Sequence, residues 1–304
     1  MRDIRRRDFV MGSAAVGWGL LAASRLDAAP FKTTLHKALY IGEPKPDTFQ
    51  ALKDAGFEGV EVRAGKATLE EATATRRQAE KIGLRIQSVL GGGSPQGLRL
   101  AAAYGAAGVL HVPGGVSGVP LPEPWEYEIE FDETKGHLTR VVQGDNEKFR
   151  PYIQAHNRSM DAARDYVQKL IPVAEETKVV IALENVWNNF CVKPSIFRWL
   201  VASFQSPWVK AYFDVGNHVK YLTPPEVWIR EFGPLLAQVH IKDFKLNPDN
   251  HGGRFVHPRD GSVNWPAVRQ AFEDVGYKGW LTIEDGGISY PEFNQRLDLI
   301  IAGQ

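Results

Sequence analysis

The apolar run LAQVHIKDF, residues 236–244, changes character within a few positions. Val239 and Ile241 are β-branched and typical of a buried strand, yet His240 lies between them and Lys242 follows directly. A single histidine of this kind is more often a hydrogen-bonded core residue than a ligand. Three other apolar runs also stop at an ionisable residue: VVIALE (179–184), VKAYFD (209–214) and GWLTIE (279–284). Four apolar runs that each stop at an ionisable residue indicate buried strands with functional side chains at their ends.

Short apolar runs alternate with helical patterns along the whole chain. Four more runs, at residues 37–42, 56–63, 84–92 and 107–115, bring the number of predicted strands to eight. Apolar residues at spacings of three and four predict helices within 68–83, 158–177 and 265–277. This alternation predicts an α/β fold, a (β/α)8 barrel. A doubly wound open sheet is the alternative, but YIGEPKPD (40–47) is not the glycine-rich phosphate loop that such sheets usually carry.

The composition argues against several other classes of protein and of site. The chain has 304 residues and a formal net charge of zero, so no basic excess is present to bind nucleic acid. Cys191 is the only cysteine, which excludes an intrachain disulfide and a cysteine-based zinc site. Residues 118–146 are acidic and rich in aromatic residues, so we expect an insertion at the exit of the fourth strand. Residues 30–304 are thus predicted to form a single barrel domain.

The first 29 residues have the pattern of a targeting segment. Arg6 and Arg7, with Phe9 at the expected offset, resemble a twin-arginine export signal. The apolar run from Phe9 to Ala23 is too short for an ordinary membrane span. We therefore expect a periplasmic protein without stable membrane insertion after processing. An uncleaved N-terminal anchor is the alternative, because Asp27 is unfavourable three positions before a cut after Ala29.

Functional groups of a barrel gather at the C-terminal ends of its strands. Glu184, Asp214, His240 and Glu284 would therefore meet on one side of the barrel mouth. Three carboxylates brought together repel one another and resist burial, and a divalent cation resolves that conflict. Carboxylate oxygens with one imidazole suit manganese best, with magnesium, cobalt or zinc as alternatives. The sequence predicts one divalent metal at this position.

Four segments carry a resemblance to a known family: ALENVWNNF (182–190), AYFDVGNHVKY (211–221), VHIKDF (239–244) and GSVNWPAVRQAFEDVGYKGWLTIED (261–285). With them the chain resembles the sugar-phosphate isomerase/epimerase family of xylose isomerase-like barrels, which includes ketose 3-epimerases. The resemblance implies that Glu184, Asp214, His240 and Glu284 bind the metal. It also implies that Glu184 and Glu284 form the catalytic acid–base pair, and that the barrel is a homo-oligomer.

Polar and aromatic residues near the strand ends are candidates for contacts with a sugar. The candidates are Glu61, Asn185, Trp187, Asn188, Asn217, His218, Lys242 and Arg259, with Arg254 as an alternative to Arg259. Each also has a structural reading, such as a turn-forming amide or a solvated loop arginine. His111 is expected to be structural. Asp285 is an alternative to Glu284, although period-two alternation lets only one of them face the metal.

Three functions fit these residues. The first is a metal-dependent epimerase or isomerase that removes a proton next to the ketone of a sugar. Export argues for a substrate without phosphate. The second is a lyase or hydratase that acts on 3-keto-glycosides, in which the same enolate expels a leaving group. The third is a non-catalytic periplasmic sugar-binding protein, for which four metal-type ligands would be superfluous and two lobes would be expected.

Overall fold

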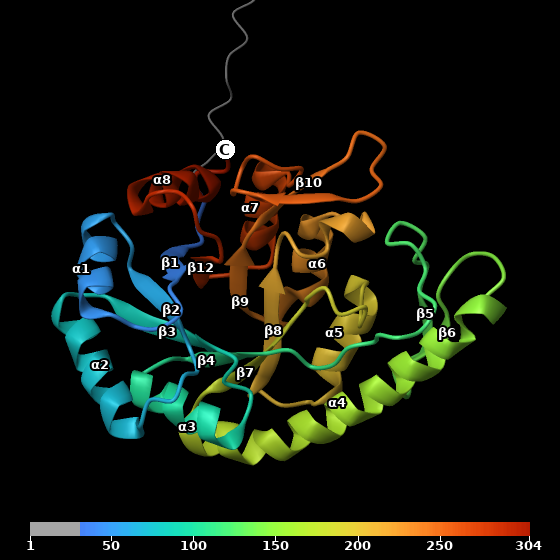
Figure 1. Cartoon of the computed structure of the whole chain (residues 1–304), viewed down its shortest axis with the longest axis horizontal. Coiled ribbons are helices and arrows are strands. Elements are labelled where there is room, and N and C mark those ends of the chain that lie inside the picture. The colour runs from blue at the N-terminus through green and yellow to red at the C-terminus, as the bar shows by residue number, and fades with distance from the viewer. Residues whose placement is uncertain (1–30) are drawn as a thin grey trace, which may run out of the picture. The chain divides into compact units, whose positions relative to one another are not determined.

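Eight parallel strands close into a barrel in the computed structural model, which describes residues 31–304 (Figure 1). Around the barrel the order is β1, β12, β9, β8, β7, β4, β3 and β2. Each predicted strand range overlaps one of these strands, so the predicted barrel is confirmed. The strands are β1 His36–Tyr40, β2 Gly59–Arg63, β3 Arg85–Leu90, β4 Gly108–His111, β7 Val180–Glu184, β8 Val209–Asp214, β9 Leu236–Ile241 and β12 Trp280–Ile283.

A helix follows each barrel strand and packs on the outside of the barrel, as Figure 1 shows. Seven of these eight helices have proline in the first or second position, where the missing N–H costs no hydrogen bond. Three short 3₁₀ helices cover Glu147–Phe149, Val219–Tyr221 and Gly233–Leu235. The α-helices are α1 Pro46–Asp54, α2 Leu69–Lys81, α3 Pro95–Tyr104, α4 Arg150–Thr177, α5 Pro194–Ser203, α6 Pro225–Phe232, α7 Trp265–Asp274 and α8 Tyr290–Ile301.

Two antiparallel hairpins extend the barrel. The first pairs β5 (Glu130–Asp132) with β6 (His137–Arg140), within the range 118–146 that is expected to be an insertion. Asn157 of α4 binds it by accepting from the backbone N–H of Leu138 and donating to its carbonyl. Helix α4 begins eight residues before the predicted helix, which gives it the length to reach this hairpin.

The second hairpin follows β9 directly and pairs β10 (Asp243–Leu246) with β11 (Gly253–Val256). Asp243 is buried, and its carboxylate accepts hydrogen bonds from four backbone N–H groups and one indole, those of Phe244, Arg259, Gly261, Val263 and Trp265. One side chain therefore fixes both ends of a long connection above the barrel mouth.

The inside of the barrel is largely polar in its upper part. Among residues 31–304, Leu110, Ala182 and Tyr212 form a small buried cluster separate from the main core, with Leu90 and Val180 packed against it. Buried polar residues fill the rest, and Gln87 for example donates to the hydroxyl of Thr282 at 2.9 Å. Such a filled, hydrogen-bonded interior can hold charged groups in fixed positions at its mouth.

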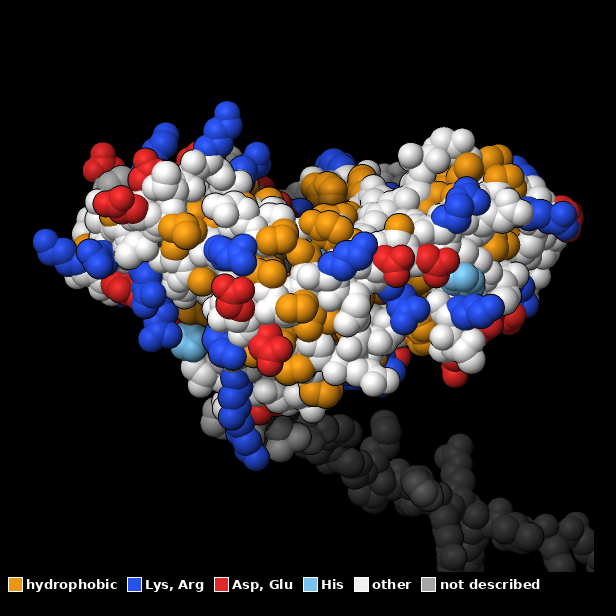
Figure 2. Space-filling model, turned by 90° about the horizontal axis from the view of Figure 1, so that it is seen from below, with side chains coloured by type: hydrophobic (Ala, Val, Ile, Leu, Met, Phe, Trp, Pro, Cys, Tyr) orange, Lys and Arg blue, Asp and Glu red, His pale blue; other side chains and the backbone are white. Residues whose placement is uncertain are grey.

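Residues 1–29, with the predicted export signal, lie outside the described part of the chain. Among residues 31–304, no helix combines the length and apolar character needed to cross a bilayer. On the face shown in Figure 2, basic and acidic side chains are interspersed, with small apolar areas between them. This mixed face agrees with the balanced composition and offers no continuous basic surface for nucleic acid.

Substitution of Trp228 should test how far the outer core stabilises the barrel. Trp228 is fully buried and stacks on Phe213 at a centroid distance of 5.8 Å. We expect Trp228→Ala to lower the free energy of unfolding by about 3–5 kcal/mol, measured by urea denaturation with the slope unchanged. Val227→Ala is the matched control, since Val227 is 43% exposed and its loss should cost less than about 0.5 kcal/mol. Equal losses for both variants would contradict this assignment of the core.

Candidate metal centre

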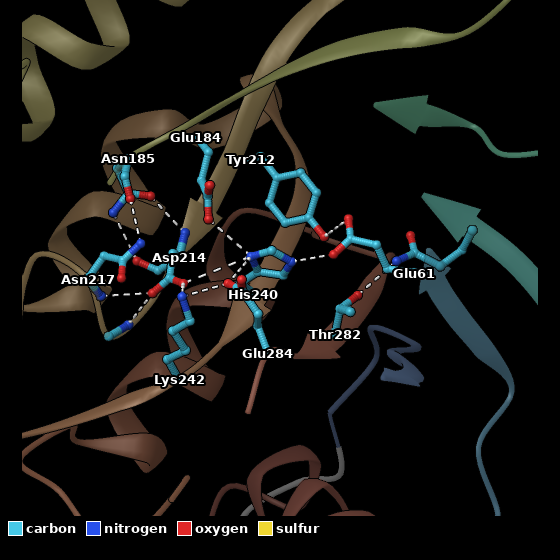
Figure 3. A network of polar contacts seen from close by, with 12 residues as sticks. Glu61, Glu184, Asn185, Tyr212, Asp214, Asn217, His240, Lys242, Thr282 and Glu284 are labelled. Carbon is cyan, nitrogen blue, oxygen red and sulfur yellow. Dashed lines mark hydrogen bonds and ion pairs between the residues drawn. The ribbon is translucent and has the colours of Figure 1, made fainter. Parts of the chain in front are cut away.

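Four barrel strands bring three carboxylates and an imidazole together at the mouth. Glu184 ends β7, Asp214 ends β8, His240 lies near the end of β9, and Glu284 follows β12. One ligand atom from each lies within 4.8 Å of those of the other three. Because β7, β8, β9 and β12 are consecutive in the barrel, their inward-facing residues converge as the sequence predicts (Figure 3).

His240 lies between two sets of carboxylates, as Figure 3 shows. Its Nε2 lies 2.6 Å from Oε2 of Glu61, while its Nδ1 faces Glu184 and Glu284, each at 3.1 Å. Nδ1 is 3.9 Å from Oδ2 of Asp214. A hydrogen bond from Nε2–H to Glu61 fixes the ring so that Nδ1 points into the carboxylate cluster. The ring is thus oriented as a ligand would be.

Glu61 contacts the His240 nitrogen that is opposite the one facing Glu184 and Glu284. The side chain is fully buried, and its second oxygen accepts a hydrogen bond from the hydroxyl of Tyr212 at 3.1 Å. Both carboxylate oxygens are therefore occupied by residues of the barrel interior. These contacts with His240 and Tyr212 give Glu61 a positioning role, and its contact with a substrate stays a prediction.

Asp214 is held by the turn that follows it. Its Oδ1 accepts hydrogen bonds from the backbone N–H groups of Gly216 and Asn217, at 2.9 and 2.8 Å. Its buried Oδ2 accepts no hydrogen bond within the described part of the chain. One oxygen is thus anchored, while the other faces the cluster with Lys242 Nζ at 3.2 Å.

The amides of Asn185 and Asn217 connect the ends of β7 and β8. Asn185 accepts from the backbone N–H of Asp214 at 2.7 Å and donates to its carbonyl at 3.0 Å. Asn217 donates to the carbonyl of Asn185 at 2.9 Å. Both side chains are buried, and each forms these hydrogen bonds with backbone groups. We predicted substrate contacts for both, but the structure gives them a role in positioning Asp214.

Lys242 contributes a positive charge beside two of the carboxylates. Its Nζ lies 2.6 Å from Glu284 and 3.2 Å from Asp214. Burial opposes the charge, but the two carboxylates outweigh it and raise the pKa of Lys242, so the side chain stays a cation. These contacts place the ammonium group among the carboxylates that face His240, and the predicted contact of Lys242 with a substrate stays a prediction.

The carboxylates differ in their preference for a proton. Burial raises the pKa of Glu184 to about 7, although His240 acts in the opposite direction. For Glu284 burial acts upward too, but the hydrogen bond and charge of His240, together with Lys242, lower its pKa to about 2. For His240 itself burial is outweighed by the surrounding carboxylates, which raise the pKa. The space beside Nδ1 therefore attracts positive charge, from a proton or from a metal ion in its place.

The donor set fits a divalent cation. Three carboxylates and one ammonium group leave two negative charges in a buried site when His240 is neutral. Oδ2 of Asp214 accepts no hydrogen bond among residues 31–304 and faces the cluster beside Lys242 Nζ, 3.2 Å away, which leaves it available to a metal ion as well. Oxygen ligands with a single imidazole match hard or borderline divalent ions.

The remaining predicted contact residues lie at different distances from the cluster. Trp187 is 44% exposed, and its indole N–H donates to the carbonyl of Asn217. Asn188 donates to the carbonyl of Gly114 and therefore supports a loop. His218 is buried against Trp228 and Tyr221, and burial lowers its pKa to about 3. Of these three, only Trp187 presents a large surface to solvent.

Arg259 points away from the candidate metal centre. Its side chain is exposed and donates to the carbonyl of Gln304, while its backbone N–H binds Asp243. The predicted substrate contact is therefore not supported. Asp285 does not replace Glu284 either, because its carboxylate lies 2.7 Å from Nδ1 of His257. Period-two alternation separates the two acids as expected.

Two residues that hold parts of the site in position are not among the residues predicted from the sequence. Tyr212 holds Glu61, and Asp243 fixes the hairpin over the mouth. A signal was present for Tyr212, which lies two residues before Asp214 and must share its inward face. Asp243 gave a weaker signal, since an acid after a strand is most often a solvated loop residue or helix cap.

The hydrogen bond from His240 to Glu61 can be tested through metal affinity. Glu61→Gln removes the charge that orients the imidazole and increases its basicity, so we expect the Kd for Mn²⁺ to rise about 10- to 100-fold in calorimetric titration. Glu58→Gln is the control, because Glu58 lies directly before β2 and pairs with the half-exposed His36, away from the cluster residues. An unchanged Kd in Glu61→Gln would refute this role of Glu61.

Known proteins resemble this chain in sequence pattern and in fold. The sequence model of the family described as Xylose isomerase-like TIM barrel matches residues 49–298. No curated protein sequence matches. A xylose isomerase domain protein from Planctomyces limnophilus has a similar structure, with a TM-score of 0.64 and 16% identity over 90% of this chain and 97% of that chain.

Two further solved structures carry names that describe a reaction. 3-Keto-D-glucoside 4-epimerase YcjR from E. coli has a TM-score of 0.62 and 16% identity over 88% of this chain and 99% of its own. The probable 3-DHS dehydratase AsbF, involved in petrobactin synthesis, from Bacillus anthracis has a TM-score of 0.61 and 12% identity over 88% and 98%. At such identities the likeness shows the shared fold. Since the family match covers most of the sequence, the chain belongs to the Xylose isomerase-like TIM barrel family.

Proposed function

We propose that this protein is a divalent-metal-dependent sugar epimerase or isomerase that removes a proton from the carbon next to a ketone. The observation that carries the proposal is the buried cluster of Glu184, Asp214, His240 and Glu284, with Lys242 beside it. Manganese is our first choice of metal. The predicted export signal further favours a sugar without phosphate.

The metal would be held by the three carboxylates and by Nδ1 of His240. A divalent ion at this place supplies positive charge that favours removal of a proton next to a ketone. Lys242 adds a second positive charge, and its Nζ is held within hydrogen-bonding distance of Glu284. Asp214 is fixed by its turn and serves as a ligand only.

Glu184 and Glu284 can exchange protons with a substrate carbon. They come from β7 and β12, which are separated in the barrel by β8 and β9, and so approach His240 from two sides. One carboxylate removes the proton and the other returns it to the opposite face of a flat intermediate, which inverts the carbon. Glu284 is 23% exposed, so at least one of the pair is accessible from the mouth.

The relatives agree with this class of reaction. The names of two similar structures describe epimerisation of a 3-keto-glucoside and a dehydration, and both reactions can start with removal of a proton next to a ketone. A sugar-binding protein without catalysis is less well supported. Residues 32–304 form one compact unit where two lobes would be expected, and such a protein needs no buried metal-type ligands.

Exchange with solvent tests the proposal. The Mn²⁺-loaded protein is incubated in D₂O with free ketohexoses and with a 3-keto-glucoside, and proton NMR follows deuterium at the carbon beside the ketone. We expect incorporation with the native chain, and a rate lower by about 10²- to 10⁴-fold in Glu184→Gln and in Glu284→Gln.

Glu58→Gln serves as the control and should exchange at the native rate, since Glu58 lies in a half-exposed pair with His36. Exchange that persists in both glutamate variants would contradict the assigned acid–base pair. Sugar binding in calorimetry without exchange in the native protein would favour the binding-protein alternative.

A further inference from the structure

A second imidazole, that of His257, is held by the residue that follows Glu284. Nδ1 of His257 is 2.7 Å from a carboxylate oxygen of Asp285, and the other oxygen of Asp285 accepts the backbone N–H of Gly286. Asp285 directly follows Glu284, so this pair is adjacent to the cluster along β12. No hydrogen bond of Nε2 to another described residue is present, which leaves this nitrogen available to a ligand.

The pair lines a cavity of about 460 Å³ between the β10–β11 hairpin and the exit of β12. Asp285, which lines this cavity, directly follows Glu284 in the sequence. Phe255 connects the cavity to the cluster, since its ring lies 5.8 Å from Nζ of Lys242. Volumes of several hundred Å³ are typical of pockets that hold a ring-sized group. A substrate bound at the cluster could therefore extend a substituent into this space.

Two basic side chains face each other across the hairpin at this cavity. Lys245 and Arg254, which line it, are direct partners across the hairpin, and neither forms an ion pair among residues 31–304. Like charges directly opposite each other destabilise a hairpin. The acids of the cavity are already engaged, Asp285 by His257 and Asp260 by Arg296. The cavity thus presents two basic side chains without an acidic partner, and these would stabilise an oxygen anion.

We propose that this cavity binds the leaving group of a keto-glycoside and that His257, held by Asp285, gives a proton to the departing oxygen. The inference rests on the proposed function, because it uses the same enolate. Glu184 and Glu284 already suffice to invert a carbon. His257 would therefore be needed as a third proton-transfer group when an oxygen leaves the substrate.

The elimination is balanced without any further reactant. Glu184 or Glu284 takes the proton from the carbon between the ketone and the anomeric carbon. The electrons of that C–H bond form a C=C bond to the anomeric carbon, and the bond from that carbon to the aglycone oxygen breaks. Nε2 of protonated His257 donates its proton to this oxygen, so an alcohol and an unsaturated ketone are released.

The test compares two 3-keto-glucosides that differ in their leaving group. A methyl glycoside needs an acid because methoxide is a poor leaving group, whereas a 4-nitrophenyl glycoside needs little assistance. For the Mn²⁺-loaded His257→Asn variant we expect release of methanol to fall about 10²- to 10³-fold, and release of nitrophenol less than about tenfold. Deuterium exchange beside the ketone should stay near the native rate.

His251→Asn is the matched control, since His251 lies in the same hairpin region but is exposed and stacks on Trp125. Thermal denaturation checks that both variants fold. Equal losses with both glycosides in His257→Asn, or exchange without alcohol release by the native protein, would overturn this inference and leave the proposed function intact. Absence of exchange in the native protein would overturn both.

Discussion

The mutual repulsion of three carboxylates around one buried imidazole is the constraint on which the rest of the site depends. Glu184, Asp214 and Glu284 could not remain together in a barrel mouth without compensating positive charge. The chain supplies Lys242 and two backbone N–H groups for Asp214, and the remaining negative charge suits a divalent ion. The chain's own groups neutralise only part of the negative charge of these carboxylates. The cluster therefore matches a metal site in its charge as well as in its residue types.

A layer of buried residues behind the cluster fixes these charges in position. The chain of contacts from Tyr212 to Glu61 to His240 determines which ring nitrogen faces the carboxylates. Register irregularities lie beside this chain, between β2 and β3 at Glu61 and between β8 and β9 at Tyr212. Such irregularities redirect side chains relative to a regular strand, and here they allow residues from opposite parts of the barrel to meet. Positioning of His240 is thus built into the barrel interior, while the proposed reaction assigns proton transfer to residues at its mouth.

A hairpin follows β9 and borders the second cavity. The β10–β11 hairpin carries Phe255, which packs against Trp187 at 4.8 Å on one side and borders the second cavity on the other. Asp243 fixes this hairpin to the barrel through five hydrogen bonds. Barrels of one fold support different reactions through the loops at this end. The choice between returning a proton and expelling an oxygen would accordingly be made by loop residues and not by the metal ligands.

The sequence by itself determined the barrel and the four-residue cluster, because strand–helix alternation and polar strand ends are local patterns, and parallel strands align their ends. It left undecided the residues whose role depends on register and on neighbours distant in the chain. Glu61 and His240 are 179 positions apart, and the amides of Asn185 and Asn217 could equally have faced a sugar. Arg259 turned away and Asp285 paired with His257 because the hairpin folds back over the mouth. Only the tertiary structure decided these roles, since burial and hydrogen-bond partners arise when distant segments pack together.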